Sequence, residues 1–168
     1  MRERSHKKGE QYQQDVKQWL LRSGFLRLEA APFGDAYDVT KRACSLGGIA
    51  YDFSLKLHRG NVARRILYGE CKYRDERRGA GDREFREFLK RVCRSVKTAE
   101  ADDADNAVFV FLTNVPPESW REYLRDKPRF LKKRFEGETD LPPNALLAAL
   151  AERIHILVLS GSVIERIP

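Results

Sequence analysis

The sequence predicts a mixed α/β domain in which helices flank a central mixed sheet. Apolar residues follow a helical period near the N-terminus and again just after the middle of the chain. Between these helices, two segments alternate apolar and polar residues as half-buried strands do. Two later runs, 107–112 and 154–159, are apolar at nearly every position, which is typical of strands covered on both faces.

The first predicted element is a helix over residues 6–22. Tyr12, Val16 and Trp19 fall on one face of it, and Gly24 suits its end. A short strand over 25–29 should follow. Residues 30–48 have no clear period and contain several glycines, so we expect mostly loop there.

Two strands are expected next, over 50–57 and 63–73. In the first, Tyr51 and Phe53 should point to one face and Asp52 and Ser54 to the other. The short connection around Asn61 predicts an antiparallel hairpin.

The remaining elements follow the same reasoning. After a charged loop over 74–82, an amphipathic helix is expected over 82–100 and a buried strand over 107–112. Pro116-Pro117 opens a basic, aromatic-rich helical stretch to about residue 135, and Pro142-Pro143 begins a short helix to about 152. A buried strand over 154–159 and a last short strand over 163–167 complete the order.

Length and composition predict one domain over residues 1–168. The longest apolar runs are far too short to span a bilayer, so no membrane is expected. The cysteines, Cys44, Cys71 and Cys93, are odd in number and have no zinc-ligand spacing. We therefore expect a cytoplasmic protein without a disulfide framework.

Charge points to a polyanionic partner. The chain has 32 Lys and Arg against 25 Asp and Glu, a formal net charge of +7. Nucleic acid is the commonest partner of such a surface, although many basic proteins bind nothing anionic in particular.

The residues with the clearest chemical pattern are Asp52, Glu70 and Lys72. Glu70 and Lys72 are two apart on a strand and share a face, and Asp52 lies on the adjacent strand. Two carboxylates repel unless a cation joins them, and Mg²⁺ (or Mn²⁺) is the usual ion for oxygen ligands. Such an ion activates water and polarises a phosphodiester, while the lysine orients that water and stabilises developing charge.

Asp52, with Glu70-Cys71-Lys72 on the next strand, resembles the PD-(D/E)xK nuclease superfamily. Gly9-Glu10 is similar to the helical glutamate that many members use as a further metal ligand, and the helix and buried strand after Lys72 suit the family's order. The resemblance covers roughly residues 7–113, which implies a core of about 7–113 and a C-terminal elaboration of about 114–168. It implies a restriction-endonuclease-like core and cleavage of DNA, less often RNA, that leaves 5′-phosphate ends. Restriction-type endonucleases and archaeal junction resolvases fit equally.

The chain departs from that family at two places. Tyr51 replaces the proline before the aspartate, and the helix over 82–100 lacks the glutamine that some members place there. The chain beyond Asn114 has no counterpart in the family.

Two basic segments are candidate nucleic-acid contacts, because Lys and Arg neutralise phosphates. One directly follows the lysine of the triad, and the other lies in the basic helical stretch. Their residues are Tyr73, Arg74, Arg77 and Arg78 in the first segment, and Arg129, Lys132 and Lys133 in the second. The aromatic residues between the basic ones in the second segment are expected to pack in the core.

Several alternatives stay open. The triad can be read as ordinary surface ion pairs, Glu10 as an acid that favours the helix dipole, and Asp38 as a rival of Asp52. The chain can also be a non-catalytic nucleic-acid-binding module, or a nuclease subunit active only with an ATPase or another partner in a phage-defence or repair complex. A homodimer is expected by analogy, because cutting both strands usually needs two active sites.

Overall fold

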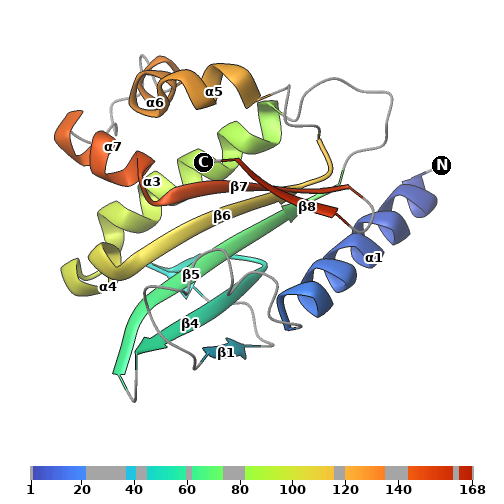
Figure 1. Ribbon diagram of the computed structural model, residues 1–168. Helices are drawn as coiled ribbons and strands as arrows, with labels where there is room; N and C mark the ends of the chain where they lie inside the picture. The colour runs from blue at the N-terminus through green and yellow to red at the C-terminus, as the bar shows by residue number, and fades with distance from the viewer. Residues whose placement is uncertain are drawn as a thin grey trace.

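A central mixed sheet organises the molecule (Figure 1). The computed structural model describes residues 2–21, 37–40, 45–59, 62–73, 82–115, 120–134, 144–160 and 163–167. Within these residues the sheet has the order β1-β4-β5-β6-β7-β8. Its strands are β1 (Tyr37–Thr40), β4 (Phe53–Arg59), β5 (Val62–Lys72), β6 (Ala107–Thr113), β7 (Ile154–Ser160) and β8 (Val163–Ile167). The pairs β5–β6 and β6–β7 are parallel and the other pairs antiparallel, so the predicted mixed sheet is confirmed.

Helices cover both faces of this sheet. They are α1 (Arg2–Leu21), α3 (Asp82–Thr98), α4 (Ala101–Asn106), α5 (Arg121–Arg125), α6 (Lys127–Arg134) and α7 (Asn144–Ala151). Tyr12 of α1 packs against Tyr73, whereas α3 packs in one cluster with Tyr68. Tyr68 lies in β5 and Tyr73 directly follows it. Side chains an odd number of residues apart along a strand point to opposite faces, so α1 and α3 lie on opposite sides of the sheet. None of the described helices is long and apolar enough to cross a membrane.

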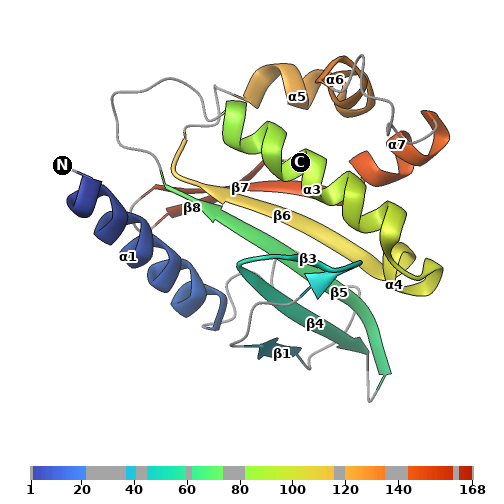
Figure 2. The same cartoon turned by 180° about the vertical axis from the view of Figure 1, so that it is seen from behind.

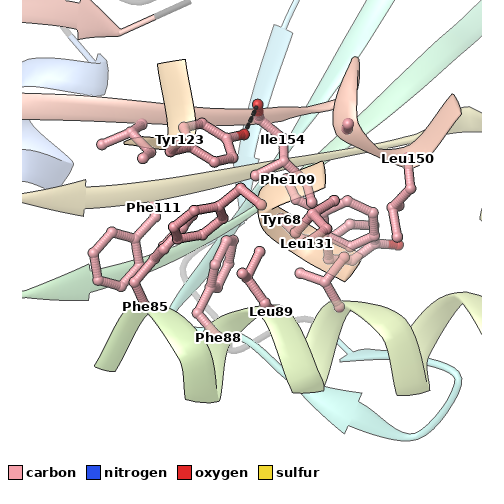
Figure 3. Close-up of a cluster of buried hydrophobic side chains, with 14 of the residues drawn as sticks. Tyr68, Phe85, Phe88, Leu89, Phe109, Phe111, Tyr123, Leu131, Leu150 and Ile154 are labelled. Carbon is pink, nitrogen blue, oxygen red and sulfur yellow. Dashed lines mark hydrogen bonds between the residues drawn. The ribbon is translucent and has the colours of Figure 1, made fainter. Parts of the chain in front are cut away.

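The apolar stripe of α3 packs into the hydrophobic core (Figure 3). Phe85, Phe88 and Leu89 are at most 1% exposed and pack beneath the central strands. The ring of Phe85 lies 5.0 Å from that of Trp120 and 5.3 Å from that of Tyr123, between ring centroids. The helices after residue 114 therefore share the core of α3.

The central position of β6 explains its composition. Every residue from Ala107 to Thr113 is buried, and β5 and β7 flank the two edges of this strand. The prediction of a fully buried strand is confirmed, and the antiparallel hairpin of β4 and β5 is confirmed as well.

The predicted loop over 30–48 and strand over 50–57 are partly wrong. The loop contains β1 and also β2 (Ser45–Leu46), which pairs with β3 (Ile49–Ala50) in a separate hairpin. Its turn requires positive φ at both central residues, and Gly47 and Gly48 supply 57° and 78°. The chain then bends before β4, so Tyr51 joins the α3 core while Phe53 packs on the other face, against Gly69.

The predicted helix from Pro116 to about residue 135 is two helices, α5 and α6. Pro128 has no backbone N–H and cannot continue α5. Asp126 between the helices is extended, and its side chain accepts a hydrogen bond of 3.1 Å from the Arg129 N–H. The predicted strand over 25–29 lies outside the described residues, as does nearly all of the loop over 74–82.

Gly69 tests the packing of the hairpin. A β-carbon at Gly69 would overlap the Phe53 ring, so Gly69→Ala should lower the free energy of unfolding by about 1–3 kcal/mol in urea denaturation. Gly9→Ala is the matched control, because a β-carbon there meets nothing within 4 Å and alanine favours a helix. Equal stability of the Gly69 variant and wild type would contradict the packing described.

Candidate functional site

The β2–β3 hairpin is anchored on the last turns of α3. The Thr98 hydroxyl lies 2.9 Å from the Gly47 carbonyl oxygen, and the Tyr51 hydroxyl lies 2.7 Å from the buried Ser95 hydroxyl. Burial raises the pKa of Tyr51, although the Ser95 hydrogen bond opposes the shift. Tyr51 is therefore a neutral phenol, and it fixes the position at which the chain turns into Asp52.

Asp52 sits at the bend between the hairpin and β4. Its Oδ2 accepts a hydrogen bond of 2.8 Å from the Cys71 backbone N–H. The β4–β5 ladder begins one residue later, at the Phe53–Gly69 pair. Beyond that pair, the Cys71 N–H bonds the Asp52 side chain instead of a backbone carbonyl of β4. The bond holds the Asp52 carboxylate at the Glu70–Cys71 peptide, although Asp52 itself lies just before β4 and not inside the strand in which it was predicted.

Glu70 is a buried carboxylate held by two cations. Glu70 is only 3% exposed. Lys72 Nζ lies 2.9 Å from its Oε1, and Arg91 Nη1 lies 2.6 Å from its Oε2. A buried carboxylate without such partners would be strongly destabilising, so the two cations make this position tolerable.

Arg91 is the site residue that the sequence reading missed. It also donates to the Ala50 carbonyl, and its guanidinium lies 5.5 Å from the centre of the Tyr51 ring. One signal pointed to it: Arg91 follows Phe88 by three residues and precedes Val92, so it borders the apolar stripe that faces the sheet. Figure 2 shows α3 running alongside β6 on this side of the sheet.

Glu10 is not brought to the two carboxylates. It is exposed on α1, and its Oε1 lies 3.2 Å from His6 Nδ1. Tyr12, two residues later and so nearly opposite on the helix, is the residue that faces the sheet. The rival Asp38 lies in β1 opposite Lys56 of β4, not in the irregular segment expected.

The predicted nucleic-acid contacts are distributed over the fold. Tyr73 packs on Tyr12, on the face opposite Lys72. Arg129 and Lys132 are exposed on α6, and Lys133 pairs with Glu122 at 3.0 Å. Arg74, Arg77 and Arg78 lie outside the described residues. The aromatic residues Trp120, Tyr123 and Phe130 are buried, which confirms the expected packing role of these rings.

The donors at the site suit a hard divalent cation. Asp52 and Glu70 offer carboxylate oxygens at one strand end, and Mg²⁺ is commonly held by one or two carboxylates and several waters. Among the described residues, no group of three or more His, Cys, Asp or Glu side chains that could hold a metal ion is found. An ion held by Asp52 and Glu70 would complete its shell with water or substrate oxygens.

Comparison of the chain with protein-family models, with curated proteins and with solved structures finds no match.

Two substitutions separate the structural role of Asp52 from its charge. Asp52→Asn keeps an oxygen that can accept the Cys71 N–H, so its free energy of unfolding should stay within about 1 kcal/mol of wild type. Asp52→Ala leaves that amide without its partner and should cost about 1–3 kcal/mol. Thermal or urea denaturation of both variants measures the difference, and equal losses would contradict the role of this bond.

Proposed function

We propose that this chain is a metal-dependent deoxyribonuclease with a restriction-endonuclease-like core that hydrolyses phosphodiester bonds. The observation that supports it best is the juxtaposition of Asp52 with Glu70 and Lys72 at the end of β5. The order of α1, the β4–β5 hairpin, α3 and β6 agrees with the order expected from the family resemblance.

Each residue has a distinct role in this proposal. Asp52 and Glu70 would hold Mg²⁺ or Mn²⁺, which would polarise the phosphodiester and acidify a bound water. Lys72 is 39% exposed at its side chain, so its ammonium borders both Glu70 and solvent. From there it would orient the attacking water and stabilise charge on the phosphoryl oxygens.

The net charge of +7 and the exposed basic residues of α6 support a nucleic-acid substrate. Arg129 and Lys132 would bind the sugar-phosphate backbone, because such contacts need charge and no particular base sequence. DNA is proposed over RNA by the resemblance alone.

A second candidate function follows from the ion pairs of Glu70. Each of its two oxygens is within 2.9 Å of a cationic nitrogen, as in a purely structural ion-pair network. This observation favours a non-catalytic nucleic-acid-binding module, or a nuclease subunit whose site is completed in a larger complex. Metal-dependent cleavage by the isolated chain separates these functions from the first.

Lys72→Ala tests the proposed activity. It should reduce cleavage of supercoiled plasmid and of a branched duplex at least about a hundredfold in Mg²⁺ or Mn²⁺, because it removes the group that orients the nucleophile. The fold should persist, since Arg91 still neutralises Glu70. EDTA should abolish wild-type cleavage, and the preferred substrate would separate restriction-like from junction-resolving activity.

Lys97→Ala, which removes an exposed lysine of α3, is the matched control and should cut like wild type. Undiminished cutting by Lys72→Ala would exclude the proposed site. A folded wild-type protein that binds DNA but does not cut it would favour the second candidate.

The basic face of α6 gives a separate prediction. Arg129→Ala and Lys132→Ala should each weaken DNA binding and lower the slope of log affinity against log salt by about one. Lys133→Ala should change both less, because its ammonium already pairs with Glu122. Fluorescence anisotropy at several salt concentrations measures this, and three unchanged slopes would exclude α6 from the interface.

A further inference from the structure

The four described side chains that make up this site balance one another in charge before any metal binds. Asp52 and Glu70 are acidic, and Lys72 and Arg91 are basic. Magnesium-binding carboxylates attract the ion through their net negative charge, which here is already neutralised. An incoming divalent cation must therefore share Glu70 with two resident cations.

Of these two cations, Arg91 is the more firmly fixed. Both cations lie within hydrogen-bond distance of Glu70, Arg91 Nη1 at 2.6 Å from Oε2 and Lys72 Nζ at 2.9 Å from Oε1. The Ala50 carbonyl and the Tyr51 ring hold the same guanidinium from the hairpin side. The planar guanidinium of arginine offers several donors in a fixed geometry, which suits these simultaneous contacts.

We propose that Arg91 is the resident counter-ion of Glu70 and lowers the affinity of the site for divalent metal. The inference rests on the proposed function, because it assumes that Asp52 and Glu70 are the metal ligands. Arg91 and the ion then compete for one carboxylate. The backbone and ring contacts of Arg91 keep it beside the site when Glu70 turns to the ion.

Burial makes this competition effective. Glu70 is 3% exposed and the Arg91 side chain is 34% exposed, so solvent screens the repulsion between the guanidinium and a bound dication only in part. A polyanion that approaches the site would offset the excess positive charge. Bound nucleic acid should therefore raise the affinity of the protein for the metal, and bound metal should raise its affinity for nucleic acid by the same factor.

The test is Mn²⁺ binding by isothermal titration calorimetry, without nucleic acid. Arg91→Gln keeps a hydrogen-bond donor near Glu70 and removes the charge, so its Kd for Mn²⁺ should fall about tenfold below that of wild type. Arg94→Gln removes the same charge from an exposed position one turn along α3 and should match wild type. Asp52→Asn in each background identifies the heat that comes from this site.

Stability supplies a second readout that does not depend on calorimetry. Without metal, Arg91→Gln leaves buried Glu70 with one cation and should melt at a lower temperature than wild type. Saturating Mn²⁺ should raise its melting temperature more than that of wild type, because binding to the folded state is tighter. If the variant fails to fold without metal, Mn²⁺ should restore its folding.

The direction in which Arg91→Gln changes the Kd for Mn²⁺ decides whether the inference holds. If Arg91 instead orients Glu70 for the metal, Arg91→Gln should bind Mn²⁺ about 10- to 100-fold more weakly than wild type. That result would overturn the inference. An unchanged Kd would overturn it as well, while leaving the nuclease proposal intact. Absence of site-specific Mn²⁺ binding in both proteins would overturn the inference and the metal site together.

Discussion

The ion-paired, buried carboxylate of Glu70 is the constraint around which this part of the fold is arranged. A carboxylate that is 3% exposed needs cations within reach, and Lys72 from the same strand and Arg91 from α3 supply them. To place Arg91 there, α3 must lie across the sheet with its apolar stripe on β5 and β6. The same guanidinium then fixes the β2–β3 hairpin through Ala50 and Tyr51.

The consequence for function is a site assembled from three elements that are far apart in the chain. Asp52 lies between the β2–β3 hairpin and β4, Glu70 and Lys72 lie in β5, and Arg91 lies in α3. Only the two carboxylates would contact a metal in the account proposed. The charge balance that they share with the two cations sets how readily the site would accept an ion, and a polyanionic substrate would shift that balance.

Much of this arrangement could be predicted from local patterns. The helix α3 and the strand β6 were predicted correctly, because burial of one helix face leaves a helical apolar period and burial of both strand faces leaves an unbroken apolar run. The two-residue spacing of Glu70 and Lys72 gave their shared face. The hairpin around Gly47 and the bend at Asp52 were missed, because they depend on positive φ angles and on contacts with α3. Arg91 was missed because it looks like any other charged residue of an amphipathic helix.

The central claim is that Asp52 and Glu70 together bind a divalent metal. The most direct measurement is anomalous diffraction from crystals of the protein grown or soaked in Mn²⁺. We expect an anomalous peak within coordination distance of oxygens of both carboxylates. A well-diffracting crystal with Mn²⁺ bound elsewhere or not at all, and with Glu70 still held by Lys72 and Arg91, would contradict the account.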